Sequence, residues 1–358
     1  MNTAYIDFIR YAIHDDVPVP IGAESIDWNN FLEFCNRQGV IGLVFGGLER
    51  SGLRIPQTIL FEWIGYAENI KRQNTVVNKR IAQANQFLKE KGCECVVLKG
   101  QANGLMYPKS ELRSPGDIDL WVRRNINHNV EDIIKVVLEV CPEADYSIHH
   151  IKMPMFKDVS LEVHYRPIFL PNWFKDKKLQ KYIDKVQGMQ FENLNNDLDA
   201  NGVGVLTRDF DVVYQLLHMW HHFFETRNNF KQMIDYYFLL KKSNLNLDDN
   251  LKKEIVNLLK KLGVLKYAKG MMWIMKEILA LEEKYLYTEP DKRIGRLILN
   301  EAMVYGTFSK NKLKEVLQQY AGNLRMVRYF PLEVMISPIY LVWHQWWKVR
   351  MKWKVAHA

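Results

Sequence analysis

The sequence predicts an α+β fold in which a mixed β-sheet and its own helices are flanked by N-terminal helices and a C-terminal helical bundle. Residues 1–92 and 207–358 carry apolar side chains at the three- and four-residue spacing of amphipathic helices. Residues 93–206 instead contain short apolar, β-branched runs, which are typical of strands. We therefore divide the chain into an N-terminal helical region (1–92), an α/β core (93–206) and a C-terminal helical domain (207–358).

The N-terminal region is expected to form helices over residues 5–13 and 28–38, followed by one long helix after Pro56. Proline is well suited to the beginning of a helix, and Gly92 follows the periodic stretch where a helix would end.

The α/β core is expected to hold five strands and one helix. The runs that predict strands are 95–99, 117–122, 146–157, 159–165 and 203–206. A helix over 128–140 separates the second strand from the third, and residues 167–178 form a loop-rich insert. The chain then returns to helices, of which the first are expected over residues 209–225, 230–243, 251–263 and 265–283.

Composition restricts the class of protein. The 358 residues are 48% hydrophobic, which is enough for an ordered core, and four scattered cysteines predict free thiols. The net charge of +8 favours an anionic partner. Nucleic acid is disfavoured because the chain has no long basic run, aromatic RNA-binding motif or paired-cysteine finger. The chain has no apolar run of membrane-spanning length, and its first residues include acids, so we expect a cytoplasmic protein.

Two carboxylates on one predicted strand are the most informative feature. Asp117 and Asp119 alternate with Ile118 and Leu120, so both aspartates face the same side, with about 6.5–7 Å between their α-carbons. Carboxylate oxygens are preferred ligands of Mg²⁺, which commonly also binds substrate phosphates. An aspartate pair also occurs on ordinary solvent-facing strands, so its context has to decide.

That context resembles a known family. The segment LKG at 98–100, Tyr107, Arg113 and the segment GDIDLWV at 116–122 resemble the uncharacterised nucleotidyltransferase family of the polymerase β-like superfamily. The resemblance covers roughly residues 93–242 and includes a helical segment in which histidines precede a helix that bears Asp235. It implies a third carboxylate from a neighbouring strand, a place that Glu162 occupies.

The resemblance implies an Mg²⁺-dependent nucleotidyltransferase that moves a nucleoside monophosphate from an NTP, such as ATP, to an acceptor hydroxyl and releases pyrophosphate. Two Mg²⁺ ions would bind Asp117 and Asp119, and Glu162 would complete the site as a metal ligand or a general base. A small molecule is favoured over a protein side chain as the acceptor.

Nucleotide contacts are expected from the end of the first strand and the turn that follows it, Gln101 included, and from the loop just before the carboxylate strand. Gly100 would present backbone amides to phosphate, while Lys99 and Arg113 would add positive charge. Gln101 departs from the Gly-Ser pair usual in the superfamily, because its amide replaces a hydroxyl. This departure supports an alternative, a catalytically inactive nucleotide-binding or scaffold protein.

Four further residues are candidates for the acceptor side or for supporting contacts. His164 shares a strand face with Glu162 and would orient it. His218 and His222 are expected to pack beside the nucleotide rather than bind zinc, because Met219 replaces the glutamate of the HExxH motif. Asp235 is either a carboxylate that forms hydrogen bonds between helices or one that approaches the acceptor, and we favour the structural role.

The C-terminal segment 339–358 combines four tryptophans with lysines and an arginine. This mixture suits a membrane surface, and a membrane-surface interaction protein is thus a third hypothesis. We favour a docked helix that buries Trp343, Trp346 and Trp347 against the bundle.

Overall fold

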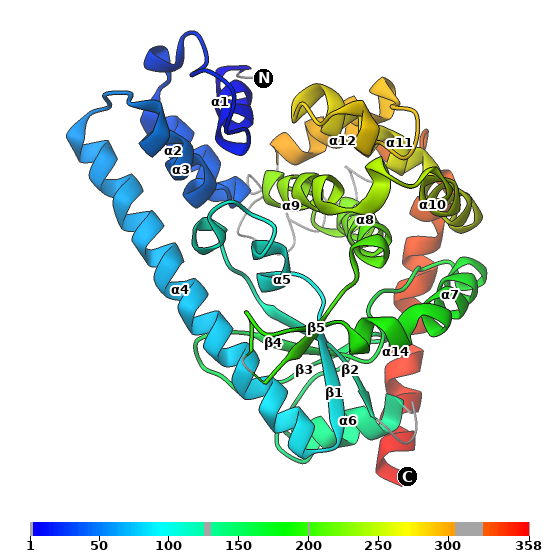
Figure 1. Cartoon of the computed structure of the whole chain (residues 1–358). Coiled ribbons are helices and arrows are strands. Elements are labelled where there is room, and N and C mark those ends of the chain that lie inside the picture. Colours follow the sequence, from blue (N-terminus) through cyan, green and yellow to red (C-terminus); the bar gives the residue numbers. More distant parts are fainter. Residues whose placement is uncertain (1–2, 125–129, 200, 305–324, 358) are drawn as a thin grey trace.

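The chain folds into a sheet layer and a helical body that is joined to it by two long helices (Figure 1). The computed structural model describes residues 3–124, 130–199, 201–304 and 325–357. The fold class predicted from the sequence, an α+β fold with a mixed sheet, is confirmed.

The helical body draws on both ends of the sequence. Its N-terminal helices are α1 (Thr3–Ile13), α2 (Trp28–Gln38) and α3 (Ile41–Ser51), of which α3 escaped the sequence analysis. Its later helices are α8 (Arg208–Glu225), α9 (Phe230–Lys242), α10 (Asp249–Leu262), α11 (Leu265–Trp273) and α12 (Lys292–Met303). One apolar core contains residues from both groups. The Gln38 side chain joins them, because its Nε2 donates to the Ala302 carbonyl at 3.0 Å.

The sheet has six strands in the order β3-β4-β2-β1-β6-β5. They are β1 (Cys93–Val97), β2 (Ile118–Arg124), β3 (His150–Lys152), β4 (Leu161–His164), β5 (Leu194–Asn195) and β6 (Val203–Val205). β1 pairs antiparallel with β2 and parallel with β6, while β2 pairs parallel with β4. The third strand is much shorter than the predicted 146–157, and β5 was not predicted.

The two faces of the sheet have different surroundings. Ile118, Leu120 and Val122 lie in an apolar core with the second half of the long helix α4 and with α6 (Val130–Leu138). Trp121, on the opposite face, belongs to the core of the helical body. Strand alternation therefore places Asp119 on the face that looks toward the helical body.

The prediction of a loop-rich insert is wrong for its second half, which begins α7 (Trp173–Glu192). Asn172 caps this helix, since its side chain accepts a hydrogen bond from the Lys175 amide. Trp173 and Phe174 are about three-quarters exposed and so gave no apolar face to recognise.

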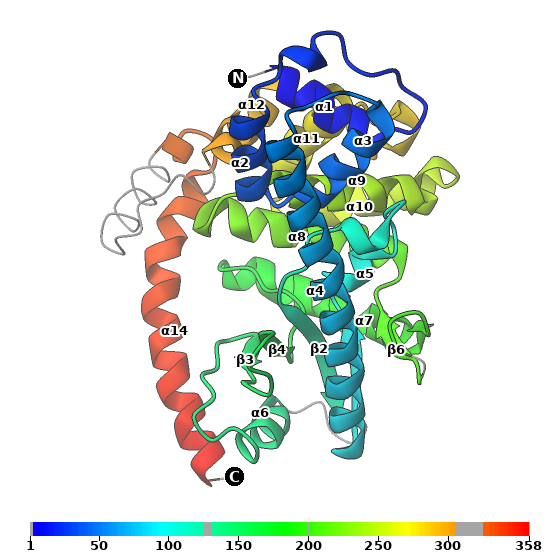
Figure 2. The ribbon, with the colours of Figure 1, turned by 90° about the vertical axis from the view of Figure 1, so that its left-hand side faces the viewer.

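Two long helices connect the layers (Figures 1 and 2). α4 (Gln57–Glu90) is about 50 Å long. It buries Trp63 in the helical body and Leu88 under the sheet. α14 (Pro331–His357) also runs from the helical body to the sheet layer, where it packs on α6.

The prediction that α14 buries three tryptophans against the bundle is wrong. Its lower half docks on the sheet layer through Trp347 and Met351, whereas Trp343 and Trp346 are 42% and 56% exposed. Among the described residues, no helix combines the length and the apolar character needed to cross a bilayer.

Candidate functional site

Strand register brings two of the predicted carboxylates together. In the parallel pair of β2 and β4, Asp119 lies directly opposite Glu162. A ligand oxygen of each lies within 4.8 Å of the other and of a His164 ring nitrogen. Asp117 immediately precedes β2, at the edge of the sheet that Gly100 borders. We call Lys99, Asp117, Asp119, Glu162 and His164 the carboxylate cluster.

Positive groups hold the innermost carboxylate ionised. The Lys99 ammonium lies 3.1 Å from Asp119 Oδ2 and 3.8 Å from Asp117 Oδ1. His164 Nε2 lies 3.0 Å from Asp119 Oδ1 and 3.6 Å from Glu162 Oε2. Burial favours a raised pKa for Asp119, but Lys99 and His164 outweigh it and lower the pKa to about 2. Burial and the neighbouring Asp119 charge raise the pKa of Asp117 instead.

Asp117 opens onto a pocket of about 220 Å³ between the sheet edge and two helices. Its side chain is 43% exposed, against 1% for Asp119. The pocket, which we call the carboxylate pocket, is lined by residues from the sheet edge, from α8 and from α9, including Lys99, Gly100, Asp117, His218, His222 and Lys231. Two of these residues, Lys99 and Lys231, are lysines, so the pocket suits an anionic ligand.

The turn after β1 has the predicted glycine but little helix. Gly100 adopts φ 67°, a conformation that favours glycine, and it is followed by α5 (Gln101–Gly104), a single turn. Any anion-binding contribution of this turn therefore comes from a few amides rather than from a helix dipole. The Gln101 side chain does not line the carboxylate pocket. Its Nε2 donates to Asn78 Oδ1 on α4 at 2.6 Å.

The guanidinium predicted to reach phosphate is bound to a carboxylate. Arg113 Nε and Nη2 donate to the two oxygens of Asp235 at 2.8 and 2.7 Å, and both side chains are buried. Asp235 also accepts hydrogen bonds from the Tyr107 hydroxyl and from Asn103 Nδ2. We call these four residues the Asp235 cluster. The favoured structural role of Asp235 agrees with these contacts, and Arg113 reaches the pocket only as part of its wall.

The α8 histidines divide between two pockets. His218 and His222 lie in the wall of the carboxylate pocket, with their Nε2 atoms 3.2 Å apart. Burial lowers the pKa of His222 to about 4 and that of His218 well below its ordinary value, so both rings are neutral at pH 7. The intervening His221 points away, toward Glu225, at 3.0 Å.

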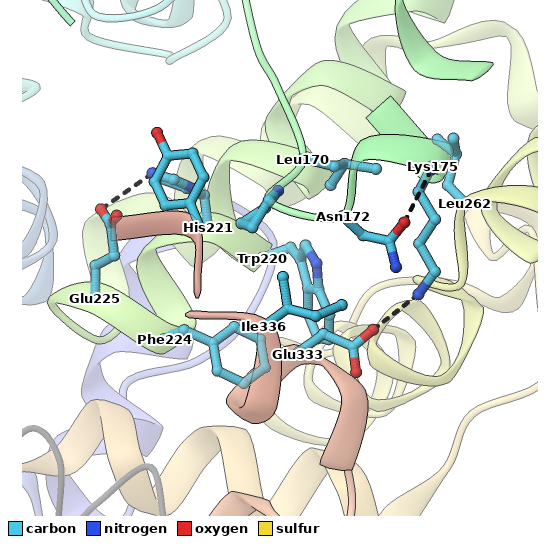
Figure 3. A pocket seen from close by; sticks show the side chains of 12 residues that line it. Leu170, Asn172, Lys175, Trp220, His221, Phe224, Glu225, Leu262, Glu333 and Ile336 are labelled. Atoms are coloured by element: carbon cyan, nitrogen blue, oxygen red, sulfur yellow. Dashed lines mark hydrogen bonds and ion pairs between the residues drawn. The ribbon is translucent and has the colours of Figure 1, made fainter. Parts of the chain in front are cut away.

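His221 and Glu225 form one end of a second, largely apolar pocket (Figure 3). Lys175 and Glu333, 2.9 Å apart, form the other end. The other side chains that line it include Leu170, Trp220, Phe224, Leu262, Ile336 and Tyr340. We call this cavity of about 80 Å³ the aromatic pocket.

Three residues near the site escaped the sequence analysis. Lys231 lies in the wall of the carboxylate pocket, where burial lowers its pKa to about 8. Lys231 precedes Asp235 by four residues, so both lie on one face of α9. This spacing could have identified Lys231 from the sequence. His149 and His150 lie beside His164, with ring centroids 5.5 and 5.2 Å from it. Their pairing depends on the short strand β3, whose register the sequence does not reveal.

Comparison with protein families agrees with the resemblance seen in the sequence. A family model described as an uncharacterised nucleotidyltransferase matches residues 24–280, which include the carboxylate cluster, the Asp235 cluster and much of the helical body. Comparisons with curated proteins and with solved structures gave no match.

Proposed function

The chain belongs to the uncharacterised nucleotidyltransferase family, and from this premise we propose that it moves a nucleoside monophosphate from an NTP to an acceptor hydroxyl. The observation that carries the proposal is the register of β2 and β4, which sets Glu162 opposite Asp119 beside a pocket that Asp117 lines. A nucleotide-transfer site needs this combination of acidic metal ligands and a cationic phosphate pocket.

The residues present fit a magnesium site. Asp117, Asp119 and Glu162 offer the hard oxygen ligands that Mg²⁺ prefers. The Lys99 ammonium lies between the two aspartates, so this position already accepts a positive charge. The chemistry supplied by two bound Mg²⁺ ions would be orientation of the triphosphate and neutralisation of the charge on the departing pyrophosphate.

The protein groups would divide the remaining work. The acceptor oxygen attacks the α-phosphorus, the bond to the bridging oxygen breaks, and pyrophosphate leaves. Lys99 and Lys231 would bind phosphate oxygens in the carboxylate pocket. Glu162, whose pKa His164 and His150 lower despite its burial, is ionised at neutral pH and would accept the proton of the attacking hydroxyl.

The aromatic pocket is our choice for the acceptor side. His221 in its wall is 6.4 Å from His149, ring to ring, and His149 is next to His164 of the carboxylate cluster. A cavity with largely apolar walls suits a small molecule with an apolar or aromatic body better than a protein side chain.

The direct test is transfer of label. The full-length chain is incubated with each of four α-labelled NTPs, Mg²⁺ and a metabolite extract. We expect pyrophosphate release and a product heavier by one nucleotide, both lost in the Asp117→Asn/Asp119→Asn variant. The matched control is Asp158→Asn. Asp158 is an exposed carboxylate that pairs with Arg80 on α4 and lines neither pocket.

Titration calorimetry separates this proposal from the inactive nucleotide-binding alternative. An enzyme should bind one NTP with an affinity that rises with Mg²⁺ and falls in the double variant. An NTP affinity that does not depend on Mg²⁺, together with no turnover of any NTP, would support the scaffold alternative that Gln101 suggests.

A further inference from the structure

Three histidines from adjacent strands meet beside the carboxylate cluster. His150 in β3 lies directly opposite His164 in β4, and His149 precedes β3. The ring centroids of His149 and His150 are 4.3 Å apart. One nitrogen of each of the three rings lies within 4.8 Å of the others. Six side-chain nitrogens thus share a small, mostly buried volume.

The three rings are largely removed from solvent, and one of their nitrogens has no hydrogen-bond partner in the described part of the chain. His149 and His150 are half-buried and His164 is buried. His164 is 5% exposed and uses Nε2 for Asp119. Within the described residues its Nδ1 is buried without a hydrogen-bond partner, which is costly for a polar atom.

Nearby groups would orient the rings of such a site. Glu162 Oε2 lies 3.8 Å from His150 Nε2 and 3.6 Å from His164 Nε2, so this carboxylate would hold the two rings in place while it stays part of the carboxylate cluster. The Ser147 hydroxyl lies 3.2 Å from His149 Nδ1, which leaves Nε2 of that ring for a metal. A hydrogen-bonded histidine pair alone would explain the 2.9 Å contact between His149 and His150, but not the unpartnered nitrogen of His164.

We propose that His149, His150 and His164 bind one divalent transition-metal ion of the zinc class, separate from the magnesium proposed for the aspartates. Imidazole nitrogen favours zinc, copper or nickel, whereas magnesium selects oxygen. The ion would fix Glu162 and join β3 to β4 at the edge of the sheet. This site requires no nucleotide.

The test measures metal content without any substrate. The full-length chain is stripped with a chelator, incubated with ZnCl₂, desalted and analysed by mass spectrometry for metal. We expect about one zinc per chain, a rise in melting temperature on zinc addition, and a tetrahedral absorption spectrum with Co²⁺. The His149→Ala/His150→Ala variant should lose at least about tenfold in zinc affinity, the lower end of losses at metal sites.

The matched control is His14→Ala, because His14 lies in the helical body and contacts the Leu279 carbonyl. It should keep the zinc. If the alanine pair unfolds, His150→Gln with circular dichroism gives the same comparison. Absence of zinc from the wild type, or equal zinc in wild type and variant, would overturn the site. Magnesium-dependent transfer by zinc-free protein is measured separately, so this proposal and the proposed function fail independently.

A second and independent observation concerns the outer face of α14. Seven exposed apolar residues recur along it at alternating spacings of three and four residues, and each is more than half exposed: Leu332, Met335, Ile339, Val342, Trp346, Val349 and Trp353. By helical spacing this stripe lies opposite the docked face, which carries Tyr340, Trp347 and Met351. An apolar stripe of this length marks an interaction surface.

The positive charge beside the stripe indicates which kind of partner binds there. The sequence has no acidic residue from 334 to 358, and exposed Arg350 and Lys352 lie near the stripe. Two of the neighbouring lysines, Lys348 and Lys354, are paired with Asp145 and Glu131. We infer that the stripe lies on an anionic bilayer surface, where tryptophan and basic side chains are favoured together. A second copy would bring like charges together, which disfavours it.

Vesicle flotation tests this inference with the full-length chain. We expect flotation with vesicles containing one part anionic phosphatidylglycerol to about two parts phosphatidylcholine, and little with phosphatidylcholine alone, since basic residues gain affinity near anionic lipid. The Ile339→Gln/Val342→Gln/Trp346→Gln variant should bind at least about tenfold more weakly. The control is Phe61→Gln/Leu247→Gln, which changes two exposed apolar residues elsewhere. Equal flotation of both variants, or a dimer that the triple variant breaks, would overturn it.

Discussion

The carboxylate cluster and the Asp235 cluster border the same pocket but differ in how fully their polar atoms are bonded. Both oxygens of Asp235 receive hydrogen bonds from Arg113, with further ones from Tyr107 and Asn103. In the carboxylate cluster Asp117 is 43% exposed, and His164 keeps a buried nitrogen without a hydrogen-bond partner among the described residues. A saturated cluster holds structure, whereas an unsaturated one has capacity left for a ligand.

The largest expected effect is on catalysis through the unsaturated cluster. Asp119→Asn removes a carboxylate charge and should lower the rate of nucleotidyl transfer by about 10³-fold, a typical loss for an electrostatic group in an active site. The melting temperature should fall less than in a variant that breaks a fully buried ion pair, because Lys99 keeps Asp117 at 3.8 Å and His164 can release its proton. Single-turnover transfer and thermal unfolding measure the two effects. Normal turnover would contradict the proposed function.

The saturated cluster should respond in the opposite way. Arg113→Met leaves the buried Asp235 charge unpaired and should lower the free energy of unfolding by about 3–5 kcal/mol, as expected for breaking a buried ion pair. Urea unfolding measures it. The Arg113→Met/Asp235→Leu double variant is the control, and it should regain most of the loss because neither charge remains. A stable Arg113→Met variant with weak NTP binding would instead show that Arg113 contacts phosphate.

The two clusters also differ in how much of them could be predicted from the sequence. Asp117 and Asp119 followed from local strand alternation, and α2 was predicted at its observed bounds. The Arg113–Asp235 pair joins residues 122 positions apart, and nothing in either neighbourhood indicates the partner. The sequence therefore presented Arg113 as an available cation.

The misses in the fold have a similar physical cause. α7 begins with the exposed pair Trp173 and Phe174, while its buried apolar residues are few, so the helical period was weak. Trp343 and Trp346 of α14 were predicted to be core residues because tryptophan is usually buried in bundles. Which of its two apolar faces docks depends on α6 and Asp145, far away in sequence.

Asp211 extends the comparison to a buried carboxylate that forms no ion pair within the part of the chain that the structure describes. Gln215 donates to its Oδ2 at 3.0 Å, and burial raises its pKa to about 8. Because the folded state binds this proton more tightly than the unfolded state, stability from this group is complete below about pH 4. It is lost progressively as the pH rises to about 8.

Asp211→Asn removes this titration and should stabilise the fold at pH 8 by at least about 1.4 kcal/mol, the value of one pKa unit. The wild type and the variant should have closer stabilities at pH 5. Urea unfolding at both pH values measures the change with pH. Asp209→Asn, two residues earlier on α8, is the matched control. A difference between wild type and Asp211→Asn that does not grow with pH would contradict the assignment.

The smallest expected effect is at Gln101, the departure from the superfamily pattern. Its amide donates to Asn78 rather than into the carboxylate pocket, so Gln101→Ala should cost about 1 kcal/mol of stability through one lost hydrogen bond. Transfer should change by less than about threefold, because a group outside the pocket contributes little to binding the transition state. The control is Gln86→Ala on α4, whose amide bonds to exposed Glu90. A rate gain above about tenfold in Gln101→Ser would show that the missing hydroxyl limits phosphate binding, and that the departure belongs to the unsaturated cluster after all.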